Sequence, residues 1–215
     1  MKKSVTPYNQ EDSKKKQVTE MFDGISTEYD ALNRKISLGI DVKWRRRVVD
    51  LLIPKKPESI LDIATGTGDL ALALTATRAS RIVGLDISAG MLSVGKYKVK
   101  MENLENTIEM VIGDSEALTY DDNSFDAVTV AFGVRNFENL ELGLSELFRV
   151  LKPGGTLVVL ETAVPTRFPF KQGYKFHTQV IIPLMGKLFT RDQAAYKYLS
   201  DSAAVFPHGK QFNNI

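Results

Sequence analysis

The chain has 215 residues, 43% of them hydrophobic, and a formal net charge of +2 at pH 7. This size suits one domain with a sizeable core, and a charge near zero favours neither a nucleic-acid partner nor an acidic tail. The absence of cysteine excludes a disulfide scaffold and a thiol nucleophile, and two histidines are too few for us to expect a metal site. The N-terminus lacks the apolar core of a signal peptide and no run reaches membrane-spanning length, so we expect a cytoplasmic protein.

The first third of the chain is expected to be helical. Residues 1–16 are polar and lysine-rich, and we expect them to be frayed. Apolar side chains then recur at helical spacing from Val18 to Tyr29, and a second helix is expected over residues 41–52, ending before Pro54.

From residue 59 onward, strand and helix patterns alternate. The expected strands cover residues 59–64, 81–87, 108–113, 125–132 and 156–162, and the expected helices cover residues 68–76, 89–100 and 140–151. This alternation predicts an α/β fold with a doubly wound, Rossmann-like parallel sheet whose ligand crevice lies at the carboxyl ends of the strands.

The last quarter, residues 163–215, is rich in proline and aromatic residues and has a helical pattern only in patches. We expect it to be an aromatic and helical insertion over the crevice. The whole chain, 1–215, is then one domain, with N-terminal helices in residues 1–54, a cofactor-binding core in 55–162 and a substrate-side cover in 163–215.

A glycine turn flanked by carboxylates follows the first expected strand. Gly66 and Gly68 can take positive φ and let a ligand approach the backbone, and Asp62 and Asp69 stand on either side of them. Such loops usually hold phosphate, often with a lysine or arginine, but none occurs between Asp62 and Thr77, and Asp69 would repel phosphate. The turn therefore favours an adenosine ligand with positive charge and no phosphate, and S-adenosylmethionine fits that description.

A nicotinamide dinucleotide is the competing ligand. Residues 66–71 satisfy the relaxed dinucleotide fingerprint, and Asp86 lies about 18 residues past Gly68, near the usual position of a ribose-binding carboxylate. The two carboxylates beside the turn favour the sulfonium instead, and Asp114, after the third strand, adds an acceptor for an adenine amino group.

Together these features resemble the class I S-adenosylmethionine-dependent methyltransferases. Within them the chain is similar to the C-methyltransferases of menaquinone and ubiquinone synthesis, through motifs at residues 29–33, 37–44, 64–69, 132–136 and 196–200. The resemblance implies methylation of a reduced demethylmenaquinone to menaquinone. Thr65 and Ala131 differ from residues common in that family. Relatives continue beyond the position equivalent to Asn214 with a final strand pair, so we expect about five strands in this sequence.

The family pattern implies cofactor contacts by Thr67, Asp86, Asp114 and Ser115. Asp86 would accept hydrogen bonds from both ribose hydroxyls, and Asp114 one from the adenine amino group, with the Ser115 backbone beside it. Thr67 and the loop, including Asp62, Gly66 and Gly68, would surround the methionine part. Met91 either packs on the adenine or belongs to the helix–sheet core.

The implied acceptor is a naphthalenediol that becomes nucleophilic at a ring carbon when a hydroxyl loses its proton. Arginine is a poor base, so we assign Arg135 to hold the ionising hydroxyl, Asn136 to orient it and Asp69 to accept the proton, directly or through water. Two alternatives stay open: an ion pair of Arg135 with Asp69 that only shapes the loop, and His177 as the base.

The implied acceptor also carries a polyprenyl tail. Aromatic and aliphatic residues within 163–200 would hold the tail or, equally, cover the core. A cluster of basic side chains lies beside Trp44, at Lys43 and residues 45–47. This cluster indicates either contact with an anionic membrane surface or a solvated helix face. Self-association as a homodimer is a further prediction.

Three other functions compete. The chain could methylate a different small-molecule or lipid acceptor, bind the cofactor without chemistry, or act as a nicotinamide oxidoreductase. A binding-only protein would need Asp86 and Asp114 but not Arg135 and Asn136, so their presence favours an enzyme.

Overall fold

The computed structural model describes residues 5–8, 11–181 and 192–215. Its centre is a five-stranded sheet with the order β3-β2-β1-β4-β5, in which every neighbouring pair is parallel. The strands are β1 (Ser59–Ile63), β2 (Arg81–Asp86), β3 (Ile108–Ile112), β4 (Phe125–Ala131) and β5 (Leu151–Leu160). The expected α/β sheet is therefore confirmed.

The strand order reverses between β1 and β4, because β1 pairs with β2 on one side and with β4 on the other. A doubly wound sheet opens a crevice at such a reversal, at the carboxyl ends of the strands. Leu61 and Ile63 in β1 and Val83 in β2 are fully buried, as expected for inner strands covered on both faces.

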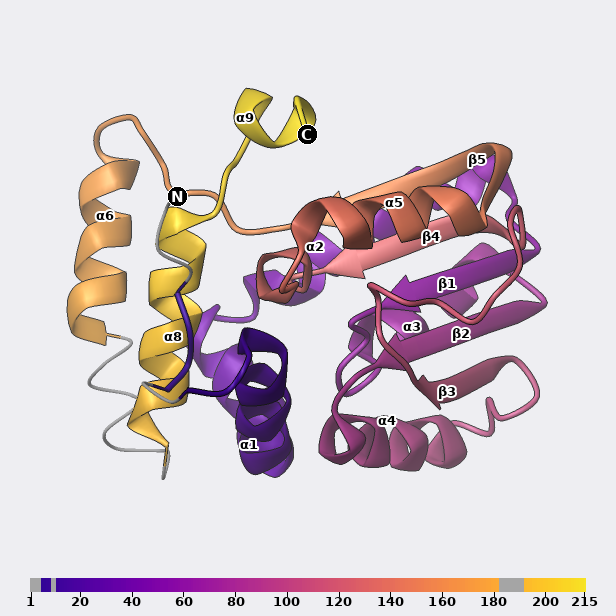
Figure 1. Cartoon of the computed structure of the whole chain (residues 1–215), viewed down its shortest axis with the longest axis horizontal. Helices are drawn as coiled ribbons and strands as arrows, with labels where there is room; N and C mark the ends of the chain where they lie inside the picture. The colour runs from indigo at the N-terminus through magenta and orange to yellow at the C-terminus, as the bar shows by residue number, and fades with distance from the viewer. Residues whose placement is uncertain (1–4, 9–10, 182–191) are drawn as a thin grey trace.

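Helices cover both faces of the sheet (Figure 1). The helices are α2 (Ile40–Leu52), α3 (Asp69–Leu74), α4 (Ala89–Met101) and α5 (Leu140–Val150). Each lies within about two residues of its expected bounds, except that the chain tightens into short 3₁₀ turns after α2 and α3. One core cluster joins α2, α3 and α4 to the sheet through residues such as Leu52, Leu74 and Leu92, and a second joins α5 through Leu147.

β5 begins earlier than the strand expected from residue 156, because residues 151–155 already belong to it. β4 pairs with β5 through Phe125 and Leu151 and next through Ala127 and Thr156. The extra residues of β5 between these two pairs form an irregularity, in which Gly154 has φ of +79°. Within the described residues no strand follows β5, which makes β5 an edge of the sheet.

The expectation of a frayed N-terminal segment is wrong for its last residues. Helix α1 (Lys14–Ile36) already includes Lys14 and Lys15, because Ser13 caps it by accepting a hydrogen bond from the backbone N–H of Lys16. Together with α8 (Gln193–Val205), α1 forms a third apolar cluster that includes Met21, Met91 and Tyr196.

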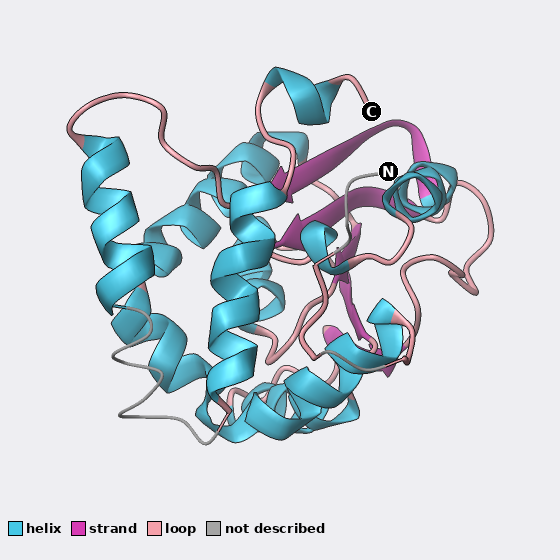
Figure 2. Cartoon of the chain, turned by 60° about the vertical axis from the view of Figure 1, so that its left-hand side comes forward, coloured by secondary structure: helices cyan, strands magenta, loops and turns pink. Residues whose placement is uncertain are grey.

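The strand ends point toward this third cluster, and α6 (Phe170–Phe176) stands on its outer side (Figure 1, Figure 2). A π-helical turn (His177–Ile181) continues α6, and a short helix α9 (Lys210–Asn213) lies near the C-terminus. In the described part of the chain, no helix is long and apolar enough to cross a membrane.

Candidate active site

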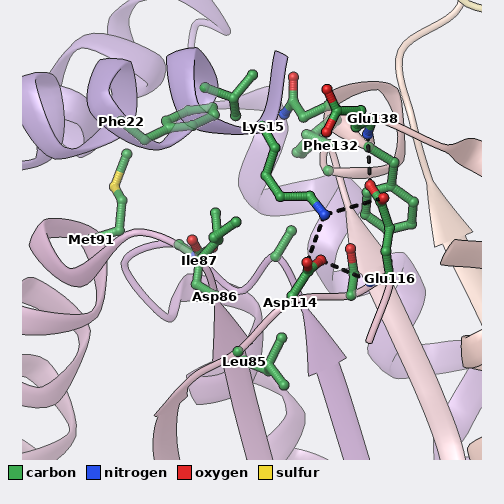
Figure 3. Close-up of a pocket in the computed structure, with 18 of the residues that line it drawn as sticks. Lys15, Phe22, Leu85, Asp86, Ile87, Met91, Asp114, Glu116, Phe132 and Glu138 are labelled. Carbon is green, nitrogen blue, oxygen red and sulfur yellow. Dashed lines mark hydrogen bonds and ion pairs between the residues drawn. The ribbon is translucent and has the colours of Figure 1, made fainter. Parts of the chain in front are cut away.

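A first cavity of about 80 Å³ lies at the carboxyl ends of β1, β2 and β3, under α1 (Figure 3). Of the residues expected to bind a cofactor, it is lined by Gly66, Asp86, Met91, Asp114 and Ser115. The sequence analysis did not single out several other lining residues, among them Lys15, Phe22, Ile87 and Glu116.

Backbone N–H groups hold both oxygens of Asp86. Gly66 N–H donates to Oδ2 and Ser88 N–H donates to Oδ1, each at 2.8 Å. Burial raises the pKa of Asp86 above its ordinary value, and these backbone donors oppose that shift. An ionised carboxylate offers about four acceptor positions, more than these backbone donors fill, so Asp86 can still accept a hydrogen bond from a diol at the cavity wall.

Asp114 forms an ion pair with a residue of α1. Lys15 Nζ lies 2.7 Å from Asp114 Oδ2 and 3.3 Å from Glu116 Oε2, and Asp114 Oδ1 accepts from the backbone N–H of Glu116 at 2.9 Å (Figure 3). The hydrogen bond to Asp114 raises the pKa of Lys15. The carboxylate expected to meet an adenine amino group is thus covered by an ammonium group.

Three loop residues expected to bind the cofactor line neither this cavity nor the second cavity described below. Asp62 is buried beneath the loop and accepts hydrogen bonds from Thr65 Oγ1 at 2.6 Å and from Thr129 Oγ1 at 2.7 Å. Thr67 Oγ1 donates to Asp30, and Gly68, with φ of +80°, is the N-cap residue of α3. Asp62 therefore braces the turn, and burial raises its pKa to about 6.

Asp69 also lines neither cavity. It forms ion pairs with Lys98 at 2.6 Å, Arg34 at 3.4 Å and Arg45 at 3.8 Å. Both Asp69 oxygens are paired with cations, and of these cations only Arg45 lines the second cavity. Arg135 is not among the partners of Asp69, so the expected proton acceptor and the alternative Arg135–Asp69 ion pair both lack geometric support. The side chain of His177 lies outside the described residues.

A second cavity of about 350 Å³ lies between α1, α2, α8 and the end of β4. It shares Tyr29 and Phe132 with the first cavity. Half of its other lining residues are apolar or aromatic, namely Ile36, Leu38, Ile40, Trp44, Tyr174, Tyr196, Leu199 and Ala203, and the other half are polar or charged.

Two consecutive residues after β4 face different cavities. Asn136 lines the first cavity and Arg135 lines the second. Tyr198 OH donates to Asn136 Oδ1 at 3.0 Å, and burial raises the pKa of Tyr198 to about 12, so this hydroxyl stays a donor. Lys14 Nζ donates to the carbonyl oxygens of Arg135 and Phe137, each at 2.8 Å, and burial lowers the pKa of Lys14 to about 8.

The Arg135 guanidinium is buried and paired with a carboxylate that the sequence analysis missed. Arg135 Nη1 donates to Glu161 Oε1 at 2.5 Å and to the carbonyl oxygen of Phe132 at 2.8 Å. The two charged side chains are 7% and 9% exposed. Phe132 itself has a left-handed φ of +59°, held by its N–H bond to Leu160 O and by the arginine, and backbone strain of this kind clusters at functional sites.

The residues present suit an adenosine ligand without phosphate. The glycine turn has no lysine or arginine, and its Gly66 N–H already donates to Asp86. Asp86 at the end of β2 and Asp114 after β3 add acidic groups to the cavity wall. This arrangement on a doubly wound sheet defines a class I methyltransferase, which uses S-adenosylmethionine as methyl donor.

Comparison with known proteins identifies the family. The model of the ubiE/COQ5 methyltransferase family matches residues 10–215. A demethylmenaquinone methyltransferase of Bacteroides fragilis is 47% identical over 212 residues, which cover 98% of this chain and 86% of that protein. The chain therefore belongs to the ubiE/COQ5 methyltransferase family, as its resemblance predicted.

Other relatives agree. A demethylmenaquinone methyltransferase of Thermus thermophilus is 45% identical over 87% of this chain and 84% of its own length. A ubiquinone/menaquinone biosynthesis C-methyltransferase of Geotalea daltonii is 43% identical over 93% of this chain and 85% of its own.

Two solved structures share the fold. The [4+2]-cyclase SpnF has a TM-score of 0.64 at 17% identity and covers 88% of this chain and 89% of its own. A S-adenosylmethionine-dependent methyltransferase of Thermotoga maritima, described as a possible histamine N-methyltransferase, has a TM-score of 0.54 at 21% identity, covering 74% and 68%.

Proposed function

We propose that this enzyme transfers a methyl group from S-adenosylmethionine to a ring carbon of reduced demethylmenaquinone, which gives menaquinone. The observation that carries the proposal is the contact between the two cavities. They meet at Tyr29 and Phe132, so a cofactor in the first cavity and an aromatic acceptor in the second would approach each other there.

Two carboxylates and their neighbours would hold the cofactor in the first cavity. Asp86 would accept from the ribose hydroxyls and Asp114 from the adenine amino group, with Ser115 beside it. Met91 is 1% exposed and belongs to the third apolar cluster while it also lines this cavity, so it serves packing and the adenine wall together. When bound, S-adenosylmethionine supplies an electrophilic methyl group.

Arg135 would stabilise the negative charge that develops on the acceptor oxygen as its hydroxyl ionises. A buried guanidinium acts with little screening by water, and its planar group is already oriented by Glu161 and the Phe132 carbonyl. Asn136, fixed by Tyr198, would orient the reacting groups from the first cavity. No covalent nucleophile is required.

The apolar and aromatic half of the second cavity's lining suits a naphthalene ring and the start of a polyprenyl tail. From residues 163–200 it receives Tyr174, Thr178 and residues of α8, whereas Phe168, Phe170 and Phe176 are exposed. Of the other residues expected to hold the tail, residues 182–191 lie outside those described.

The same cavity lies beside an apolar and basic surface. This surface supports peripheral contact with a membrane in which the polyprenyl tail of the acceptor would be dissolved. Leu38 is 80% exposed and Trp44 41% exposed, and both line the cavity, while Lys43, Arg46 and Arg47 are exposed on α2. Arg45, by contrast, pairs with Asp41. Basic side chains add attraction to an anionic lipid surface and apolar ones anchor in it.

Flotation with lipid vesicles tests this contact. Binding should require anionic lipid and fall in Leu38→Gln and in a Lys43→Gln, Arg46→Gln variant, whereas Leu142→Gln, an exposed leucine on α5, should bind as the wild type does. Equal binding of all variants, or none to any vesicle, contradicts the contact.

Self-association would use β5, which is an edge strand among the described residues and whose backbone groups would pair with a second copy. Sedimentation over a range of protein concentrations tests this, and a monomer at every concentration contradicts it.

The direct test of the reaction supplies S-adenosylmethionine labelled in its methyl group together with reduced demethylmenaquinone. Label should appear in menaquinone only when the acceptor is reduced. Phenols and naphthols without a prenyl tail serve as comparison acceptors. Label transfer to these and none to the reduced quinone would assign a different acceptor.

A further inference from the structure

Four buried polar side-chain atoms have no hydrogen-bond partner among the described residues, and all four belong to one region. They are Arg135 Nε, Glu161 Oε2, Tyr196 OH and Ser200 Oγ. Arg135, Tyr196 and Ser200 line the second cavity, and Glu161 is bonded to Arg135 and to Thr162, which also lines it. Because each such atom typically costs about 1–3 kcal/mol, four in one place indicate a polar ligand that completes them.

The four atoms come from two separate walls. Arg135 and Glu161 follow the carboxyl ends of the adjacent strands β4 and β5. Tyr196 and Ser200 are four residues apart on α8 and therefore share one face of that helix. Two walls that each carry unpartnered polar groups, on either side of a cavity with an apolar and aromatic part, match a ring that carries two oxygens. A diol such as a reduced quinone has this shape.

We propose that Glu161 accepts the hydroxyl proton of the acceptor and that Tyr196 and Ser200 bind its second ring oxygen. This inference rests on the proposed function. Glu161 Oε1 is committed to Arg135 Nη1 and to the Thr162 N–H, at 2.5 Å and 2.8 Å, while Oε2 keeps its lone pairs. Glu161 thus takes the role that the sequence analysis gave to Asp69.

The step balances as follows in the second cavity. The hydroxyl proton passes to Glu161 Oε2, and the oxygen's electrons make the neighbouring ring carbon nucleophilic. That carbon forms a bond to the methyl carbon while the methyl–sulfur bond breaks, and sulfur keeps the electron pair as a neutral thioether. The ring carbon then loses its hydrogen to water as a proton, and Glu161 returns its proton to the oxygen, which restores the aromatic diol.

Variants of the two carboxylates test the proton acceptor. Glu161→Gln should lower single-turnover methyl transfer by about 10²–10⁴, the usual contribution of a general base, with S-adenosylmethionine affinity unchanged in calorimetry. The loss should shrink at higher pH, and with an acceptor made more acidic by a ring halogen, because such a hydroxyl ionises without help. Glu161→Asp keeps the carboxylate and should retain part of the turnover with the wild-type pH profile.

Asp69→Asn is the matched comparison, because it also removes one carboxylate from an ion-paired group. If Asp69→Asn shows the loss that pH rescues, Asp69 is the acceptor and the inference falls. It falls equally if folded Glu161→Gln turns over normally, or if its loss responds neither to pH nor to the acidic acceptor, since Glu161 would then only brace Arg135.

The binding half has a readout that needs no turnover. Trp44 is the single tryptophan of the chain and lines the second cavity, so its fluorescence reports a short-tailed demethylmenaquinol bound beside S-adenosylhomocysteine. Tyr196→Phe and Ser200→Ala should each weaken this binding by roughly tenfold or less, as expected for one hydrogen bond. Ser202→Ala is the control, because Ser202 bonds to Leu199 O within α8 and lines neither cavity.

Unchanged affinity in both variants overturns the assignment of the second oxygen. Failure of the proposed function looks different: the wild type would then methylate other acceptors but not reduced demethylmenaquinone.

Discussion

In the first cavity each oxygen of Asp86 and Asp114 already has a donor from the protein, whereas in the wall of the second cavity and just behind it four buried polar atoms have no partner among the described residues. The Asp86 donors are backbone groups of the glycine turn and of the α4 N-terminus, so they are fixed by the sheet itself. The polar atoms around the second cavity belong to side chains of η3 (Val134–Asn136), α8 and the residue after β5.

The difference separates two ways of preparing a site. A carboxylate held by backbone N–H groups is preorganised before a ligand arrives, so its ligand adds bonds to an ordered frame. Unpartnered buried groups carry a desolvation cost, and a ligand with matching oxygens relieves that cost on binding. Specificity for the acceptor should therefore depend on polar matching more than on the size of the apolar lining.

The largest expected effect comes from breaking the charged pair of the second cavity. Arg135→Ala should lower turnover by about 10²–10³, because one preorganised donor to the developing oxyanion is lost. Affinity for S-adenosylmethionine should stay near that of the wild type, because Arg135 lines only the second cavity. Stopped-flow methyl transfer and calorimetry measure the two quantities.

Arg135→Ala also leaves Glu161 without its cation, which typically costs about 3–5 kcal/mol of stability for a buried pair. Arg135→Lys keeps the charge without the planar fork, so it should stay folded and recover only part of the turnover. A folded Arg135→Ala protein with normal turnover, or one that only fails to bind cofactor, would show that Arg135 merely supports the loop.

The next effect belongs to the first cavity. Asp86→Ala should weaken S-adenosylmethionine binding by about 10- to 100-fold, because hydrogen bonds to a charged group contribute about 1.5–3 kcal/mol and some are shared. Gly66 and Ser88 also lose their acceptor, so the turn loosens. Asp86→Asn keeps one acceptor oxygen and should fall between. Unchanged affinity in folded Asp86→Ala removes Asp86 from the cofactor site.

The carboxylate beneath the turn tests the frame rather than the ligand. Burial raises the pKa of Asp62 to about 6 from an ordinary 3.8, so between those values the folded state binds more protons than the unfolded state. Stability therefore falls as pH rises through this window. One pKa unit corresponds to about 1.36 kcal/mol, so wild type should lose roughly 2–3 kcal/mol relative to Asp62→Asn.

Urea unfolding of both proteins from about pH 4 to about pH 7 measures this difference. Asp126→Asn is the control, because Lys152 and Ser59 lower the pKa of Asp126 to about 2 and its contribution changes only below the window. A constant difference between wild type and Asp62→Asn across the window would mean that Asp62 stays ionised in the folded protein.

The sequence predicted the parts of the site that depend on local pattern. Alternation of strands and helices placed Gly66, Asp86 and Asp114 at the carboxyl ends of parallel strands, and these ends necessarily share one edge of the sheet. The adjacency of Arg135 and Asn136 was visible as well. That they face different cavities was not, because the 3₁₀ turn that carries them sets each direction separately.

The missed residues depend on contacts between distant segments. Glu161 follows β5 with no motif of its own, and only the pairing of β4 with β5 brings it to Arg135, 26 residues away. Asp69 was assigned a role because it stands beside the glycines, yet helix α3 turns it toward Lys98. Lys15 was expected to lie in a frayed lysine-rich segment, because polarity alone does not reveal that a helix there pairs with Asp114 and Glu116.

Lys15 gives the smallest expected effect and bears on the first cavity alone. If the adenine amino group binds Asp114, it must displace or share the Lys15 ion pair, whose side chains are 31% and 30% exposed. Pairs this accessible contribute about 0.2–1 kcal/mol, so Lys15→Met should tighten S-adenosylmethionine binding by roughly two- to fivefold.

The wild-type affinity should also rise with salt, which screens the pair, whereas the variant should respond less. Calorimetry at two salt concentrations measures both, with Lys16→Met as control because Lys16 pairs with Asp12 and lines neither cavity. Weaker binding by Lys15→Met would instead make Lys15 part of the cofactor's own wall, closing α1 over the adenine.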